Sequence, residues 1–173
     1  MNDIIQNMMA RRSIRKYKPE QIKDEELELI LQAGAYAPSG KGAQPVHLVV
    51  IQDKAAIAQL SKMNADIMGT TSDPFYGAPT VIVVLADKAR PTFCEDGSLV
   101  LGNLMNAAHS VGVDSCWIHR ARQEFDSDEG KALLKKWGIA GDYAGIGHCI
   151  LGYHDDNYPS AAPRKKDFVT YVK

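Results

Sequence analysis

The stretch TVIVVLA at residues 80–86 decides the fold, because it is continuously apolar and rich in β-branched side chains. A strand that faced water on one side would alternate apolar and polar residues, and this one does not. The stretch therefore predicts a central strand that is buried on both faces. Three further segments, residues 47–52, 115–118 and 145–153, are predicted to be strands as well.

Helices are predicted between and around these strands, from apolar residues at helical spacing and from capping residues. They cover residues 3–9, 24–35, 54–68, 95–111 and 126–137. In the third of them Ile57, Leu60 and Met68 are expected to face the core, and in the last Asp126 is expected to be the N-cap. Because helices and strands mix along the chain, we predict one α+β domain that spans residues 1–173.

Composition limits the classes of function. The 173 residues carry a formal net charge of −1 and are 45% hydrophobic, so neither nucleic acid nor an anionic membrane is an expected partner. The N-terminus lacks the pattern of a signal peptide, and the apolar runs are shorter than a membrane span. Cys116 and Cys149 lie in apolar surroundings, as buried reduced thiols do, so a cytoplasmic location is expected.

The end of the chain, residues 158–173, differs from the rest. It is rich in Pro and Lys and then alternates weakly in hydrophobicity through Phe168, Val169, Tyr171 and Val172. This segment is not expected to fold onto its own core unaided, and an alternating apolar tail often pairs with another subunit. We therefore expect a C-terminal arm that reaches a partner subunit.

A basic segment, RRSIRKY at residues 11–17, follows the first predicted helix. The guanidinium group of Arg presents a rigid fork of donors that matches phosphate oxygens, and Ser adds a neutral donor. The same composition suits a solvated basic turn or a patch that contacts RNA. Charge alone leaves these interpretations open, although RNA binding is disfavoured by the net charge and by the lack of interleaved aromatic residues beyond Tyr17.

Three other segments are candidates for a binding site. APSGKGAQP at residues 37–45 is rich in small residues that let a flat ring approach the backbone, SCWIHR at 115–120 ends a strand in a polar turn, and PRKK at 163–166 is basic. Taken singly, each is explained as well by a loop, a strand end or a basic tail. The five histidines show no metal-ligand spacing, so no metal site is expected.

Taken in order, these segments resemble the nitroreductase family of FMN-dependent NAD(P)H oxidoreductases. The matching pieces are RRSIRKY, APSGKGAQP, DPFYGAPTVIVVLAD, DGSLVLGNLMNAAHSVGVDSCWIH and PRKKDF, and their order and separations match over nearly the whole chain. The resemblance implies a central mixed β-sheet surrounded by helices, in an intertwined homodimer with FMN at the subunit interface. It also implies electron transfer from NADH or NADPH to small electron-poor acceptors, such as nitroaromatics or quinones, by a ping-pong mechanism.

By this resemblance, the FMN phosphate is expected to bind Arg11 and Ser13 together with Arg164 and Lys166 from the tail. The two ends of the chain would then meet at one phosphate group. Because FMN itself carries the redox chemistry, no side chain is expected to act as a catalytic acid or nucleophile.

The rest of the flavin is expected to contact two other parts of the chain. Arg12 and Arg15 would reach the ribityl chain and the pyrimidine edge of the ring. Pro38, Ser39 and Gly40 would come from the partner subunit and contact the ring. The site would therefore be incomplete in a single subunit.

The remaining expected contacts include positions where this chain departs from the family. Ile118, His119 and Arg120 would line the other side of the flavin, with backbone N–H groups near N5 and O4, but the family often has Glu-Gly at the last two positions. Gly42 stands where the family usually has Asn, which removes one expected hydrogen bond across the subunits. The chain is also short for the family, so the helices that cover the flavin in longer members have no counterpart.

The sequence leaves other functions open as alternatives. One is a flavin-binding or storage module without turnover, which NAD(P)H would not bleach. Another is a specialised family member that destroys flavin or removes halide from an aromatic substrate, although such members need lid elements that this short chain lacks.

Overall fold

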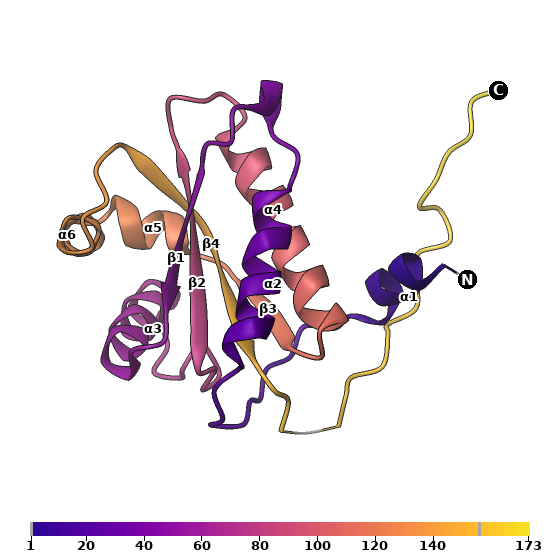
Figure 1. The fold of residues 1–173 in the computed structure, drawn as a ribbon, viewed down its shortest axis with the longest axis horizontal. Coiled ribbons are helices and arrows are strands. Elements are labelled where there is room, and N and C mark those ends of the chain that lie inside the picture. Colours follow the sequence, from indigo (N-terminus) through magenta and orange to yellow (C-terminus); the bar gives the residue numbers. More distant parts are fainter. Residues whose placement is uncertain (1, 156) are drawn as a thin grey trace.

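The computed structural model describes residues 2–155 and 157–173 and shows three layers, with one β-sheet between two groups of helices (Figure 1). The strands are β1 (Val46–Ile51), β2 (Thr80–Asp87), β3 (Asp114–Ile118) and β4 (Tyr143–Gly152). Their order in the sheet is β1-β2-β4-β3, and each neighbouring pair is antiparallel. The α+β class predicted from the sequence is confirmed.

Strand β2 is buried on both faces, as its unbroken apolar sequence predicts. Because side chains alternate along a strand, its residues divide between two hydrophobic clusters. The cluster on one face contains Val81, Val83 and Leu85. The cluster on the other face contains Ile82, Val84 and Ala86. Each cluster is completed by apolar side chains of the helices on its side, and this burial holds the three layers together.

Helices α2 (Asp24–Ala35) and α4 (Phe93–Ser110) cover one face of the sheet (Figure 1). Helices α3 (Lys54–Met68), α5 (Ala121–Asp126) and α6 (Asp128–Lys136) cover the other face. Helix α1 (Asp3–Ala10) lies near the C-terminal end of α4, where the Asn7 side-chain amide donates to the Asn106 carbonyl at 2.8 Å. The short 3-10 helix η1 (Gly40–Gly42) lies instead near the N-terminal end of α4.

Two local predictions were wrong. The segment from residue 121 to 136 forms two helices, and Ser127 between them caps α6 by accepting from the Gly130 amide at 3.0 Å. Asp126 therefore ends α5, and its carboxylate pairs with Lys88 at 2.9 Å. Met68 is 54% exposed at the end of α3, whereas Leu60 is fully buried and Ile57 packs half-buried against the core, as expected.

The parallel component of the expected mixed sheet is small. It consists of one isolated parallel bridge between Ser13 and Ser115, which attaches the segment after α1 to the free edge of β3. The Ile14 amide donates to the Ser115 carbonyl at 3.1 Å in this bridge. The bridge brings together two segments that are about a hundred residues apart in the chain.

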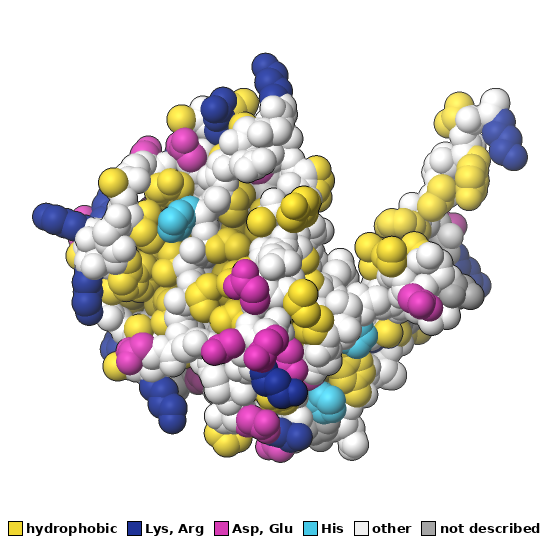
Figure 2. Space-filling model, viewed as in Figure 1, with side chains coloured by type: hydrophobic (Ala, Val, Ile, Leu, Met, Phe, Trp, Pro, Cys, Tyr) yellow, Lys and Arg dark blue, Asp and Glu magenta, His cyan; other side chains and the backbone are white. Residues whose placement is uncertain are grey.

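Two parts of the molecule leave large apolar side chains in water. Helix α1 buries none of its residues, and its apolar side chains, such as Ile4 and Met9, are 65% and 60% exposed. Residues 157–173 are exposed throughout and project past α1 as an extended arm (Figure 1). Hydrophobic side chains follow this arm (Figure 2), with Phe168 at 85% and Val172 at 96% exposure. Within the described residues, no helix has both the length and the hydrophobicity that a membrane crossing requires.

Candidate functional site

The basic segment at residues 11–17 is fixed to the edge of the sheet by its apolar residues. Ile14 and Tyr17 are buried, and the Tyr17 hydroxyl donates to the Ile14 carbonyl at 2.9 Å. A second isolated bridge joins Tyr17 to His154. While Ile14 and Tyr17 occupy the core, Arg11 and Arg12 are half-buried and Arg15 is exposed.

Arg11 has an unused donor in a buried position. Its Nη1 atom is buried and has no hydrogen-bond partner within the described part of the chain, and the same is true of the Ser115 hydroxyl beside Ser13. A buried donor without an acceptor is costly, so such atoms point to a ligand that supplies acceptors. Phosphate oxygens are suitable acceptors for a guanidinium group and a hydroxyl.

Arg12 is placed differently from its neighbours. Its Nη1 atom donates to the carbonyl oxygens of Met9 at 2.7 Å and of Arg11 at 2.6 Å, so the guanidinium caps the end of α1. Its backbone amide donates to the Tyr158 hydroxyl at 3.0 Å, which anchors the start of the arm. The Nε atom of Arg12 is buried and has no hydrogen-bond partner among the described residues, and contact between Arg12 and a ribityl chain stays a prediction.

The C-terminal end of α4 completes this corner of the molecule with His109. Its ring stacks with Tyr158 at a centroid distance of 5.9 Å. Burial first, and then the positive charges of Arg11 and Arg12, lower the pKa of His109 against the opposing effect of Asp114. The imidazole is therefore neutral at neutral pH and leaves the positive charge of this corner to the arginines.

Arg15 shares a cavity with the turn between β3 and α5. The cavity has a volume of about 200 Å³ and is lined by Arg15, Cys116, Ile118, His119 and Arg120, among others. Two segments that were separate candidates in the sequence therefore meet in space. Burial raises the pKa of the Cys116 thiol, so this group is a neutral thiol at neutral pH and is a poor nucleophile.

The turn after β3 is held by a buried amide that sequence reasoning missed. Asn64 of α3 is fully buried, its side-chain nitrogen donates to the His119 carbonyl at 2.8 Å, and its Oδ1 accepts from Nε of Arg120 at 3.0 Å. The same side-chain nitrogen bonds Glu124, whose other carboxylate oxygen lies 2.7 Å from Nε2 of His148. The one signal in the sequence was a polar residue at 64 on a helix face that also carries the apolar Leu60.

The loop with Pro38, Ser39 and Gly40 lies far from the basic segment. The Gly40 amide donates to the Asp96 carboxylate at 2.9 Å, near the N-terminal end of α4. The 18 residues of α4 span about 27 Å and separate this loop from the corner that holds Arg11. Within one subunit, the structure therefore does not bring the loop to the other predicted site residues.

Gly42 has a left-handed backbone conformation with φ of +65°, and a Cβ atom added there would meet nothing within 4 Å. Asn is one of the few other residue types that adopts this conformation readily. The absence of the family's usual Asn therefore removes a side chain from the surface of the loop without any steric reason inside this subunit.

Arg164 and Lys166 lie on the exposed arm. Nε of Arg164 donates to the Ala162 carbonyl at 3.1 Å, a local contact within the arm itself. The structure of one subunit therefore leaves these two residues apart from Arg11 and Ser13, with which they were expected to share a phosphate.

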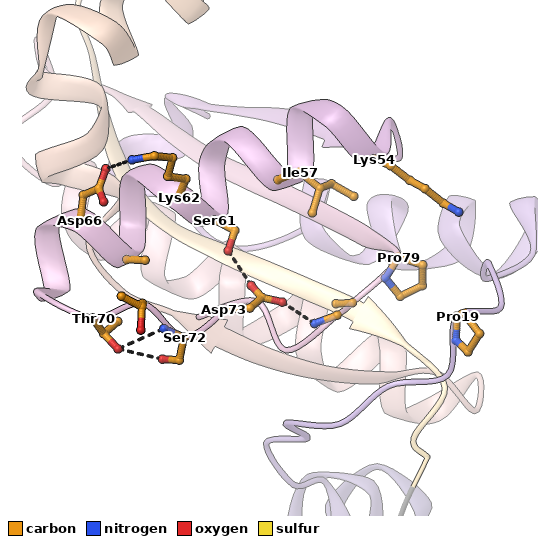
Figure 3. Close-up of a pocket in the computed structure, with 15 residues that line it drawn as sticks. Pro19, Lys54, Ile57, Ser61, Lys62, Asp66, Thr70, Ser72, Asp73 and Pro79 are labelled. Atoms are coloured by element: carbon orange, nitrogen blue, oxygen red, sulfur yellow. Dashed lines mark hydrogen bonds and ion pairs between the residues drawn. The ribbon is translucent and has the colours of Figure 1, made fainter.

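The largest cavity described contains none of the predicted site residues. It has a volume of about 630 Å³ and lies between α3 and the segment at residues 70–79 (Figure 3). On its floor the Ser61 hydroxyl donates to Asp73, and on its rim Lys62 pairs with Asp66 at 2.6 Å (Figure 3). Ser72 and Asp73 also line the cavity that contains Arg15, so the two hollows adjoin. No group of three or more His, Cys, Asp or Glu residues suited to a metal ion occurs in the described ranges.

Comparison with known proteins decides the family. The nitroreductase family profile matches residues 8–71 and 63–153, which include the basic segment, the loop at 38–42, β2 and the turn after β3. The chain belongs to the nitroreductase family. This nitroreductase-family chain is 30% identical over 161 residues to an Archaeoglobus fulgidus protein provisionally named NADH dehydrogenase/NAD(P)H nitroreductase, with 90% of this chain and 88% of that protein covered.

Two further relatives extend the comparison. An NADPH-flavin oxidoreductase of Vibrio harveyi is 28% identical, with 95% of this chain and 70% of that protein covered. The crystal structure of a Bacteroides fragilis nitroreductase with bound FMN superposes with a TM-score of 0.92 at 27% identity and covers 100% of both chains. The family predicted from the sequence is confirmed, and the relatives' names agree with the predicted enzyme class.

Proposed function

We propose that this nitroreductase-family protein is an FMN-dependent oxidoreductase that passes electrons from NADH or NADPH to small electron-poor acceptors. The observation that carries the proposal is the meeting of Arg15 with Ile118, His119 and Arg120 around one cavity, next to the Ser13–Ser115 bridge. The family resemblance assigns these same segments to one cofactor. The FMN bound by the Bacteroides fragilis relative, which covers the whole chain, supports the same assignment.

The residues present fit FMN at its phosphate end. Two buried donors lack acceptors among the described residues, Nη1 of Arg11 and the Ser115 hydroxyl. Ser13 adds a further hydroxyl beside them. In this proposal Arg11 and Ser13 hold the phosphate, and Arg15 faces the pyrimidine edge of the ring. FMN, when bound, supplies the two-electron hydride chemistry, while the protein supplies binding, orientation and electrostatics.

The proposed functional unit is a homodimer whose two arms are exchanged. Each subunit is one domain with an arm from about residue 158, and that arm carries Arg164 and Lys166 to the partner's phosphate site. The apolar side chains that α1 and the arm expose would be buried between the subunits, which favours association. The loop with Pro38, Ser39 and Gly40 would reach the partner's flavin, because α4 keeps it far from its own.

The proposed reaction is ping-pong. The nicotinamide delivers a hydride, leaves, and is replaced by the acceptor in the same place. For a nitroaromatic acceptor, NAD(P)H and one proton reduce the nitro group by two electrons to a nitroso group, and one oxygen leaves as water. A cytoplasmic location belongs to this proposal, because Cys116 and Cys149 are buried thiols without a disulfide.

An absorbance spectrum of the purified protein, followed by anaerobic addition of NADH and then NADPH, tests the proposal. We expect flavin absorption that both spectrum and mass analysis assign to FMN, and we expect it to bleach with at least one of the two nucleotides. Return of the flavin absorption on addition of a nitroaromatic or quinone completes the cycle. A flavin that neither nucleotide bleaches would contradict the proposal and favour a storage role.

A further inference from the structure

Arg120 has a backbone conformation that is unusual for its residue type. Its φ is 79° and its ψ is 0°, in the left-handed region that glycine adopts without strain. A side chain in this conformation costs on the order of 1–2 kcal/mol. The family resemblance has glycine at this position, so this chain keeps an arginine where the backbone would favour its removal. A strained residue in a cavity suggests a function for its side chain.

The guanidinium of Arg120 is held at one edge only. Nε donates to Oδ1 of the fully buried Asn64 at 3.0 Å, and Nη2 lies 3.1 Å from the Met68 sulfur, which is a weak acceptor. A guanidinium has five N–H donors, so these contacts leave donors available at its other edge. Asn64 in turn is fixed by its bonds to the His119 carbonyl and to Glu124. The side chain is therefore oriented before any ligand binds.

Positive charge in this cavity is not balanced by its own lining. Arg15 and Arg120 both line it, and neither forms an ion pair with a carboxylate of the described residues. Asp73 is the carboxylate in the lining, and its two oxygens accept from the Ser61 hydroxyl and from the amides of Phe75 and Gly77. Glu124 lies behind Asn64, which separates it from Arg120.

We propose that Arg120 is a specificity residue that selects acceptors carrying a carboxylate or another anionic group beside the ring that is reduced. This inference rests on the proposed function and names the substrate class of its site. Arg15 is committed to the flavin edge in that function, which leaves Arg120 as the free cation for the acceptor. A planar guanidinium with open donors binds a carboxylate by two parallel hydrogen bonds.

The test compares two acceptors of the same shape and different charge, 4-nitrobenzoate and 4-nitrobenzamide. Isothermal titration calorimetry of each acceptor with the oxidised protein, in the absence of a nicotinamide nucleotide, measures its Kd without turnover. Arg120→Gly is the decisive variant because glycine fits the left-handed backbone, so the turn keeps its conformation. Lys131→Gln on α6 is the matched control, since it removes one exposed positive charge outside the cavity.

We expect the parent to bind 4-nitrobenzoate more tightly than 4-nitrobenzamide. In Arg120→Gly the Kd for 4-nitrobenzoate should rise about tenfold, which is about 1.4 kcal/mol, while the Kd for 4-nitrobenzamide stays within about twofold. Lys131→Gln should change neither value. Arg120→Lys keeps the charge and loses the planar fork of donors, so its Kd for 4-nitrobenzoate should lie between those of the parent and of Arg120→Gly.

For reduction by NAD(P)H, Arg120→Gly should lower kcat/KM for 4-nitrobenzoate by about the factor by which it raises the Kd, and should leave kcat/KM for 4-nitrobenzamide nearly unchanged. Equal loss for both acceptors, or no loss for either, would overturn the proposal, as would a parent that binds the amide as tightly as the acid. If neither acceptor is reduced, the proposed oxidoreductase function fails. The titrations still decide the anion preference of Arg120 in that case.

Discussion

Two basic segments of this chain were assigned to the same phosphate, and the structure treats them in opposite ways. Residues 11–17 are fixed by one bridge to Ser115 of β3, by a second to His154 just after β4, and by the buried side chains of Ile14 and Tyr17. Residues 163–166 lie on an arm that is exposed along its whole length. Both segments carry guanidinium groups, but only the first is part of the subunit's own core.

The difference shows which half of the proposed site a single subunit builds. The segment after α1 already presents a buried donor that lacks an acceptor, so it is prepared for a ligand before association. The arm exposes its apolar side chains to water, so in the proposed dimer its position would depend on a second subunit. Burial, more than charge, therefore distinguishes the preformed part of the proposed site from the part that association would complete.

Removing residues 159–173 should have the largest effect. The cut keeps Tyr158 and its bond to the Arg12 amide, and it removes Phe168, Val169, Tyr171 and Val172. Burial of such side chains is worth roughly 1.5–3 kcal/mol each, so we expect the dimer dissociation constant to rise at least about a hundredfold. Analytical ultracentrifugation measures this change. A truncated chain that remains a dimer and keeps FMN would show that the arm is dispensable.

Arg11→Ala should have the next largest effect. Loss of a hydrogen bond to a charged group costs about 1.5–3 kcal/mol, so the Kd for FMN should rise about 10- to 150-fold. Riboflavin lacks the phosphate and should bind the variant and the parent equally. Fluorescence titration of the apoprotein with both flavins makes the comparison, and an equal loss for both would assign Arg11 to the fold and not to the phosphate.

Arg15→Gln should change the midpoint potential of the flavin. A fixed positive charge stabilises the negative charge that reduction places on the pyrimidine edge. If one charge-assisted hydrogen bond of about 1.5–3 kcal/mol strengthens on reduction, the potential should fall by about 30–60 mV in the variant. Titration against a reference dye at saturating FMN provides the measurement. A shift below about 10 mV would remove Arg15 from the flavin edge, and an upward shift would reverse the charge argument.

Gly42→Asn should have the smallest effect, and it tests the loop rather than the basic segments. Asn tolerates the left-handed conformation at this position, and its side chain would enter open space in the subunit. If the loop faces the partner's flavin, the new amide restores a hydrogen bond of about 0.5–1.5 kcal/mol and tightens FMN binding about 2- to 12-fold. Gly69→Asn, at a similar open position with φ of +73°, is the matched control and should leave FMN binding unchanged.

Much of the fold was predictable because it depends on local patterns. The unbroken apolar run at 80–86 predicted the central strand, and Asp53 caps α3 through its bond to the Ala56 amide, as its residue type predicts. The division between α5 and α6 was missed because Asp126 and Ser127 are both good N-caps, and the choice between them depends on the Lys88 ion pair across the chain. Sequence spacing does not contain that tertiary contact.

The site was predictable only as a set of segments. The resemblance assigned Arg11, Ser13, Arg15 and the turn at 118–120 to the site, and the structure brings Arg15 and this turn to one cavity. The resemblance could not show that the Arg12 guanidinium caps α1, because that contact depends on side-chain geometry. Asn64 was missed for the same reason, since a single polar residue in a helix does not reveal which distant turn it holds.

In the proposed dimer each FMN site combines Arg11 of one subunit with Arg164 of the other. A heterodimer of an Arg11→Ala subunit and an Arg164→Ala subunit tests it, because exchanged arms would leave one site with both arginines and the other site with neither. Purified with two different affinity tags, this heterodimer should bind one FMN per dimer with the parent's affinity. Both single-variant homodimers should bind FMN weakly at two equal sites. A heterodimer without any site of parental affinity would contradict the claim and place both arginines in one subunit's own site.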